Sequence, residues 1–307
     1  MSKFNINEYC DIAYPVFEKF YNQAFPPRAT GRKRKNLYKV FFTIIFILRT
    51  GCQWRSVKES DELVNGSTAN RIFNAANRAG VLEKVYAAIS VTYESIIGYD
   101  TLWQSVDCTK IQAPVRGISS GKEDTGPNPT DRGFKGSKIS VLCDKQGMPM
   151  GYCISGANKH DSKLLENTLA CGSLFSLFDI DTRRRIMHLC LDKGYDGNQS
   201  EECAYLFGYI DHIRTRGEEI VEKTMGRKPK RWVVERFFGW LKGFRYIRTR
   251  YTVYSRNFKA LVGLTLSTMH VRRLLEVLPG EELVAQMLDF DWADYFNWVE
   301  EKRAAAA

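Results

Sequence analysis

The sequence predicts a protein of the α/β (α+β) class, in which a helical N-terminal region precedes a domain built on one mixed sheet. Up to about residue 98 the apolar residues follow helical spacing, whereas from residue 101 onward strand-forming runs alternate with helical segments. After residue 279 the composition becomes acidic and aromatic. We therefore expect a helical domain at 1–98, a mixed-sheet domain at 99–279, and an acidic C-terminal helix and tail at 280–307.

Two helices stand out in the N-terminal region. Asn36 is placed to cap the first, whose apolar run at 40–48 is too short to cross a bilayer. Ser67 is placed to cap the second, which runs to Arg78 and has Gly80 just past its end. A further helix is expected at 55–63. The pair at 55–63 and 68–78 has the pattern of a helix-turn-helix.

The helix at 68–78 carries side chains that suit the reading of DNA bases. Asn70, Arg71, Asn74 and Arg78 lie on its polar side. Asparagine pairs with adenine and arginine with guanine in the major groove. An ordinary polar surface helix explains the same pattern, so the rest of the chain has to decide between the two interpretations.

The mixed-sheet domain is expected to run three strands, helix, strand, helix, strand, helix. The strands are predicted at 101–109, on either side of a hairpin turn at 144–147, at 185–191 and at 209–215. The helices are predicted after Asp161 or Ser162, at 201–207 and at 230–242.

Three carboxylates occupy unusual positions in these elements. Asp107 lies inside the first strand, and Asp192 ends the buried strand at 185–191. Burying an ionised carboxylate is costly unless it is paired or binds a metal, so both positions favour a cation site. Glu235 lies on the last helix, on one face with Arg231 and Lys242. A plain Arg231–Glu235 salt bridge and solvated turns at the two aspartates remain the alternatives.

Other polar residues of this domain have local explanations. Asp144 belongs to a hairpin turn, Asp161 caps a helix and Asp196 lies in a loop. Asp131 is harder to explain, although its surroundings are typical of a turn. His160 suits either a DNA contact or a helix cap.

A long polar segment at 116–137 interrupts the domain and is too rich in glycine and proline to predict regular structure. Segments of this kind are usually functional or disordered. Arg132, Lys135 and Lys138, together with backbone amides around Gly133 and Gly136, suit binding of a phosphate backbone. The phosphate-binding motif of ATP-driven enzymes is not found after any predicted strand.

The charge of the chain favours a polyanionic partner. Lys and Arg number 45 against 35 Asp and Glu, which gives a formal net charge of +10. The excess is concentrated at 28–39 and at 227–259, and Glu235 is the only acid of the second stretch. Phe244, Tyr246, Tyr251 and Tyr254 lie among these cations, where stacking on DNA bases and packing in the core are equally good explanations.

The eight cysteines include no Cys-x-x-Cys pair, and several lie in apolar runs. This pattern predicts buried thiols rather than a zinc site or a disulfide framework, and it suits a reducing cytoplasm. The N-terminus lacks a charged leader followed by an apolar core, so we expect no secretion signal.

Four local motifs carry a resemblance to a known family. They are Asp107-Cys-Thr and the segments 126–138, 156–162 and 192–196. With the order of elements, they resemble bacterial DDE transposases of the insertion-sequence-five type, which have a ribonuclease-H-like fold. The family's last helix carries Tyr, Arg, Glu and Lys, and this chain has Arg231, Glu235 and Lys242 at three of those positions. Lys228 stands at the fourth. The resemblance covers about 25–275.

The resemblance implies a metal-dependent DNA transposase, an endonuclease and strand transferase that binds the terminal inverted repeats of its own insertion sequence. It implies Asp107 as the bridging metal ligand, with Asp192 and Glu235 each completing the shell of one of two Mg²⁺ ions, for which Mn²⁺ can substitute. Arg231 and Lys242 are expected to hold DNA phosphates.

The expected partners are double-stranded DNA, as transposon ends and target, and further copies of the chain in a homodimer or larger assembly. No membrane association is expected, and the expected location is the cytoplasm, at the nucleoid when bound to DNA. Two alternatives remain open. One is a catalytically silent DNA-binding protein derived from a transposase, and the other is a stand-alone nuclease of the same fold.

Overall fold

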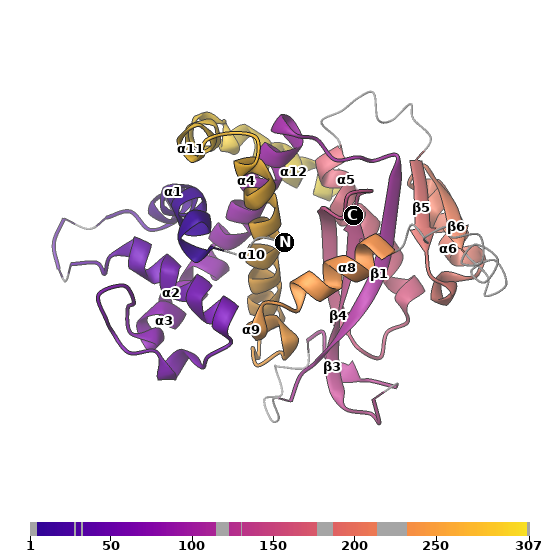
Figure 1. Ribbon diagram of the computed structural model, residues 1–307, viewed down its shortest axis with the longest axis horizontal. Helices are drawn as coiled ribbons and strands as arrows, with labels where there is room; N and C mark the ends of the chain where they lie inside the picture. The colour runs from indigo at the N-terminus through magenta and orange to yellow at the C-terminus, as the bar shows by residue number, and fades with distance from the viewer. Residues whose placement is uncertain are drawn as a thin grey trace. The chain divides into compact units, whose positions relative to one another are not determined.

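The computed structural model describes residues 5–27, 29–31, 33–114, 123–129, 131–176, 187–213 and 232–305. The chain forms two compact units (Figure 1). The first contains residues 1–47, 52–97 and 263–307, and the second contains 48–51 and 98–262. These units do not coincide with the three expected segments, because the C-terminal residues pack with the N-terminal helices.

The first unit is helical, as expected. Its elements are α1 (Ile6–Ala24), most of α2 (Leu37–Thr50), η1 (Trp54–Ser56), α3 (Gly66–Arg78), α4 (Val81–Ile96), the later part of α10 (Ser255–Leu275), α11 (Gly280–Asp289) and α12 (Trp292–Ala305). The amide of Lys39 donates to Asn36 Oδ1 at 3.1 Å, which confirms the predicted cap of α2. Tyr9 of α1 and Ser267 of α10 share a buried hydrogen bond of 2.7 Å between their hydroxyls.

The predicted helix at 55–63 is wrong, and with it the helix-turn-helix pair. After the single turn η1 the chain is irregular up to residue 65. The amide of Gly66 donates to the Val57 carbonyl at 3.0 Å, and that of Val64 donates to Thr43 Oγ1 at 3.0 Å. These bonds satisfy the backbone without a helix. The cap of α3 is Asn65, whose side chain accepts from the Ser67 amide at 3.0 Å, and not Ser67.

The second unit is built on a six-stranded mixed sheet with strands β1 (Trp103–Gln112), β2 (Gly126–Pro127), β3 (Lys135–Cys143), β4 (Pro149–Gly156), β5 (Met187–Leu191) and β6 (Tyr209–Ile213). The order is β4-β3-β1-β5-β6, and the short β2 also pairs with β3. β1, β3 and β4 are antiparallel, whereas β5 and β6 run parallel to β1. Apart from the short β2, the sheet thus has three antiparallel strands followed by two strands parallel to β1, and this arrangement confirms the expected ribonuclease-H-like fold class.

Helices cover both faces of this sheet. One face packs against η3 (Asp161–Leu164) and α5 (Leu165–Ser176), where Thr168 Oγ1 donates to Ser140 Oγ at 2.7 Å. The other face packs against α8 (Trp232–Leu241), which crosses in front of β1 in Figure 1. η5 (Lys193–Tyr195), α6 (Asn198–Leu206) and α9 (Arg245–Arg248) complete the unit.

Part of the segment expected to be irregular has regular structure. β2 pairs with the start of β3, Gly126 with Gly136 and Pro127 with Lys135. Residues 115–122 and 130 lie outside the described residues, as do Lys228 and Arg231. None of the helices in the described ranges combines the length and hydropathy needed to span a bilayer.

Candidate active site

Asp107 and Asp192 lie at matching positions of two neighbouring parallel strands. Ser105 of β1 pairs with Cys190 of β5, and two residues further each strand reaches its aspartate. Asp192 directly follows β5 and keeps an extended backbone, with φ −78° and ψ 162°. Side chains two residues apart share a face, and adjacent strands are about 4.8 Å apart. If this register continues for two more residues, the two carboxylates lie on one face of the sheet, at the same level along the two strands.

Both carboxylates are half-buried and held in the same way. Asp107 Oδ1 accepts from the Cys108 amide at 2.7 Å, and Asp192 Oδ1 accepts from the Lys193 amide at 2.7 Å. Each aspartate thus has one oxygen anchored to the backbone of the next residue. Two neighbouring carboxylates suit a hard divalent cation such as Mg²⁺ or Mn²⁺, which prefers oxygen ligands and retains waters.

Glu235 lies on α8, which packs on the same face of the sheet. Burial is the main cause that raises the pKa of the Cys143 thiol. The charges of Asp144 and Asp107 raise this pKa further, whereas the charge of Arg236 lowers it. Asp107 and the α8 residue Arg236 are therefore both near Cys143. Arg236 Nη2 also donates to the Gln146 carbonyl at 2.8 Å and so fixes α8 to the β3–β4 turn.

The carboxylate of Glu235 does not join the aspartate pair as a third ligand in this structure. Glu235 is exposed on α8, whereas Val233, Val234, Phe237, Phe238 and Leu241 form its buried side. Across the described parts of the chain, no three His, Cys, Asp or Glu side chains come close enough together to hold a metal ion.

A buried tyrosine connects the supports of the two aspartates. Tyr195 is fully buried, and its hydroxyl lies 3.3 Å from Cys108 Sγ. Its amide donates to the Asp192 carbonyl at 2.9 Å. The turn that carries Asp192 is thus tied to the residue that follows Asp107. We did not predict a role for Tyr195, although its position three residues after a strand-end aspartate is visible in the sequence.

Lys138, which the sequence suggests as a phosphate contact, is buried and paired. Its ammonium group contacts Asp161 Oδ1 and the Lys159 carbonyl, both at 2.5 Å. Lys138 pairs with Lys110 in the β1–β3 register, three residues after Asp107, so it faces η3 and α5 on the other side of the sheet. A side chain that is 4% exposed has no access to a DNA backbone in this arrangement.

The other predicted cations differ in their exposure. Arg132 and Lys135 are exposed, and Lys242 is half-buried just after α8. Arg250, counted in the basic cluster of the sequence, is 1% exposed and therefore does not belong to the surface. Arg231 lies outside the described residues. The basic stretch thus supplies both surface charges and a buried charge with a structural role.

The aromatic residues of the basic stretch divide in the same way. Phe244 and Tyr246 are buried, at 1% and 6% exposure, so packing explains both. Tyr251 and Tyr254 are 58% and 42% exposed, and the Arg256 guanidinium lies 4.9 Å from the Tyr254 ring centroid. Stacking on DNA bases therefore stays a prediction for the exposed pair alone.

The predicted base-reading residues lie on α3. Arg71 and Arg78 are exposed, whereas Asn70 and Asn74 are half-buried. The Asn74 amide group donates to the Asn70 carbonyl at 2.8 Å and also contacts Asn70 Oδ1. The two arginines are therefore the better placed of the four to contact a partner.

All eight cysteines lie in the described part of the chain, and none forms a disulfide. Cys10, Cys143 and Cys190 are buried and the others are half-buried. The prediction of buried thiols is therefore confirmed for Cys10, Cys143 and Cys190 and not for the other five.

Solved structures with some likeness to this chain include a pre-cleavage Mos1 transpososome, which shares 10% identity and has a TM-score of 0.27. The likeness covers 86% of this chain and 83% of that chain. The Mos1 mariner paired end complex with Mn also shares 10% identity at a TM-score of 0.27, with 90% of this chain and 87% of that chain covered. Likeness this loose adds nothing to the fold assignment, which rests on the strand order.

A curated relative is the "Putative transposase for insertion sequence element IS402" of Burkholderia cepacia, 34% identical over 139 residues. The matched region covers 43% of this chain and 61% of the relative, less than two thirds of its length. The family described as "Putative transposase of IS4/5 family" matches residues 11–86, and the family described as "Transposase DDE domain" matches residues 103–269. Because the second match spans more than half of the chain and includes Asp107, Asp192 and Glu235, the chain belongs to the DDE-domain transposase family.

Proposed function

We propose that this protein is an active transposase that binds the ends of its own insertion sequence, cleaves them and joins them to target DNA. The observation that supports the proposal is the register between β1 and β5, in which Asp107 and Asp192 each follow the Ser105–Cys190 pair by two residues. A DNA-binding protein without catalysis has no need for two adjacent half-buried carboxylates, whose mutual repulsion is unfavourable without a cation.

Asp107, Asp192 and Glu235 are the proposed metal ligands. Bound Mg²⁺ or Mn²⁺ would activate the attacking oxygen and stabilise the leaving oxygen of the phosphodiester. The Asp107 and Asp192 carboxylates are each anchored by a backbone amide, so they would supply the fixed part of the site. Glu235 is proposed to complete the set when DNA and the ion are bound, since catalytic contacts are often long in free enzymes.

The remaining proposed contacts belong to DNA. Lys242 and Arg231 are proposed to hold phosphates beside the carboxylates, and Arg132 and Lys135 to hold the backbone further away. Arg71 and Arg78 of α3 are proposed to contact the terminal inverted repeats. The pairing of two transposon ends requires a dimer or a larger assembly.

The test is to mix the protein, Mg²⁺ and DNA that carries the element's ends, and to look for nicked and joined products. We expect products with the native chain and none with Asp107→Asn, Asp192→Asn or Glu235→Gln, each of which should still bind DNA. Glu166→Gln is the matched control, because Glu166 is an exposed carboxylate on α5 and should keep full activity. DNA binding without any products from the native chain would support the silent DNA-binding alternative.

A further inference from the structure

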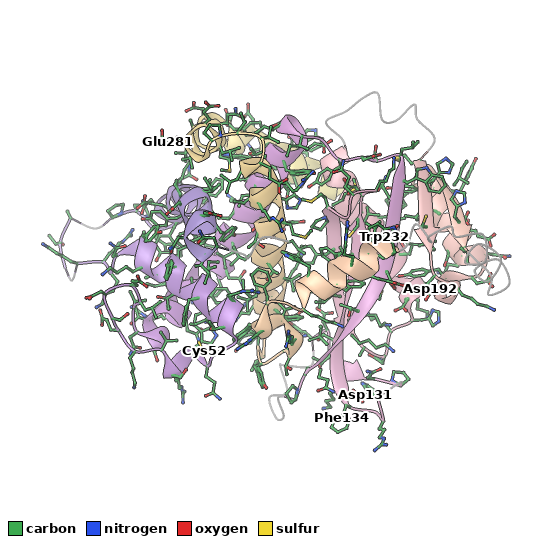
Figure 2. All side chains as sticks on the ribbon, in the orientation of Figure 1. Cys52, Asp131, Phe134, Asp192, Trp232 and Glu281 are labelled. Carbon is green, nitrogen blue, oxygen red and sulfur yellow. The ribbon has the colours of Figure 1, made fainter. Side chains whose placement is uncertain are left out.

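A projecting hairpin carries an exposed aromatic ring between two cations. We define this arm as residues 123–129 and 131–136, which include β2 and the start of β3. Phe134 is 64% exposed, and Arg132 and Lys135 beside it are exposed as well. Figure 2 shows Phe134 and Asp131 at the lower end of the sheet, beyond the other labelled residues of the second unit. An aromatic ring in this position would lose contact with water if a partner covered it, and that burial is favourable.

Hydrogen bonds stabilise the described residues at the tip of the arm. The Asn128 amide donates to the Phe134 carbonyl at 2.7 Å, and the Phe134 amide donates to the Asp131 carbonyl at 2.9 Å. Gln112 Nε2 donates to Asp131 Oδ2 at 3.0 Å, which ties the tip to β1. The backbone of Phe134 is therefore hydrogen-bonded to Asn128 and Asp131 while its ring is exposed.

The base of the arm is held by a buried arginine. Arg250 Nη1 donates to Ser137 Oγ at 2.6 Å and to the Asp124 carbonyl at 3.0 Å, and Nη2 donates to the Glu123 carbonyl at 3.3 Å. Burying a guanidinium is unfavourable unless its donors are satisfied, as they are here. The buried charge of Arg250 thus fixes the base of the arm.

The arm also contains backbone strain. Asp124 and Arg132, with φ of 53° and 47°, are the two non-glycine residues with left-handed φ in the described part of the chain. Such conformations are unfavourable and tend to occur at functional sites. The strain at Arg132 lies two residues before Phe134, in the turn that exposes the ring.

From these features we infer that the arm is a DNA-binding element in which Phe134 stacks on a base while Arg132 and Lys135 contact the flanking phosphates. Exposed rings stack on unpaired bases or enter base steps, and cations on either side suit a polyanion. The inference rests on the proposed function for its substrate. A second copy of the chain is the competing partner, and the two flanking cations disfavour it.

The experiment measures binding of the full chain to a short duplex whose single-stranded overhang carries 2-aminopurine. We expect the native chain to change the 2-aminopurine fluorescence. Phe134→Ala should abolish that change and weaken binding about tenfold, because a stacked base is lost. Phe134→Trp should retain both. Tyr205→Ala is the matched control, since Tyr205 is 79% exposed on α6 of the same unit and should have no effect.

The salt dependence of DNA binding distinguishes the contribution of the Phe134 ring from those of the neighbouring cations. Lys135→Gln should make the negative slope of log affinity against log salt less steep by about one, and it should keep the fluorescence change. Phe134→Ala should leave the slope unchanged. Unfolding midpoints of all variants are compared first, and removal of an exposed ring should leave them unaltered.

Three results would overturn the inference. One is full affinity and an unchanged fluorescence response in Phe134→Ala, and this result would leave the proposed transposase intact. Another is a loss of self-association in Phe134→Ala with DNA binding unaffected, which would assign the arm to a second copy of the chain. The last is the absence of salt-dependent DNA binding by the native chain, which would overturn the proposed function as well.

Discussion

Asp144 shows how one residue can be structural although it resembles a metal ligand. It is fully buried, and Oδ1 accepts from the Gln146 and Met148 amides at 2.8 Å each, while Oδ2 accepts from the Asp100 amide at 3.1 Å. These bonds build the β3–β4 turn, as predicted from the sequence. Burial nevertheless raises the pKa of Asp144 to about 6, because desolvation outweighs the backbone donors.

This shift predicts a pH dependence of stability. Between about pH 4 and pH 6 the folded chain binds a proton at Asp144 that the unfolded chain has lost, so the contribution of Asp144 to stability falls as pH rises. Relative to Asp144→Asn, the native chain should gain about 2 kcal/mol in free energy of unfolding from pH 7 to pH 4. Urea unfolding of both proteins at several pH values measures this difference. A difference that stays constant with pH would contradict the shift.

At the scale of elements, the Tyr195–Cys108 contact joins η5 to β1. Burial raises the pKa of the Tyr195 hydroxyl and raises the pKa of the Cys108 thiol to about 12, so both groups remain protonated near neutrality. Tyr195→Phe removes the hydroxyl and keeps the ring, and it should lower the free energy of unfolding by about 1 kcal/mol. Urea unfolding is the measurement, and Tyr205→Phe is the exposed control.

A double-mutant cycle shows whether this loss belongs to the contact itself. Cys108→Ala combined with Tyr195→Phe should cost less than the sum of the single changes, because both remove the same bond. Since η5 directly follows Asp192, Tyr195→Phe should also weaken Mn²⁺ binding about tenfold, as loss of supporting contacts does at other metal sites. Additive losses of stability would show that the two side chains act independently.

Elements with strong local patterns could be predicted from the sequence. The β3–β4 hairpin follows from two apolar runs around a turn, and the strand before Asp192 follows from a run of buried apolar residues. The helix expected at 55–63 had no such support. The conformation of that region is determined by contacts between residues distant in sequence, such as the hydrogen bond between Val64 and Thr43. Local periodicity carries no information on such contacts.

At the scale of the molecule, a count of charges identifies an excess but does not place it. Arg250 and Arg245 are close in the same basic stretch, yet the first is buried and the second is exposed. Lys138 is likewise paired with Asp161 in the interior. The candidate aspartates could be picked out from the sequence because a carboxylate inside or directly after an apolar strand is a local feature, whereas burial of these cations depends on partners far along the chain.

The location of charge, rather than its total, should therefore set the salt dependence of DNA binding. Arg245→Gln and Arg273→Gln each lower the net charge by one. Arg245 is exposed on α9 in the basic stretch of the second unit, whereas the Arg273 side chain is 43% exposed and paired with Glu276. Arg245→Gln should make the negative slope of log affinity against log salt less steep by about one, because one phosphate contact is lost. Arg273→Gln should leave it unchanged. Fluorescence anisotropy with a labelled duplex at several salt concentrations measures both slopes, and equal effects of the two variants would show that net charge alone governs binding.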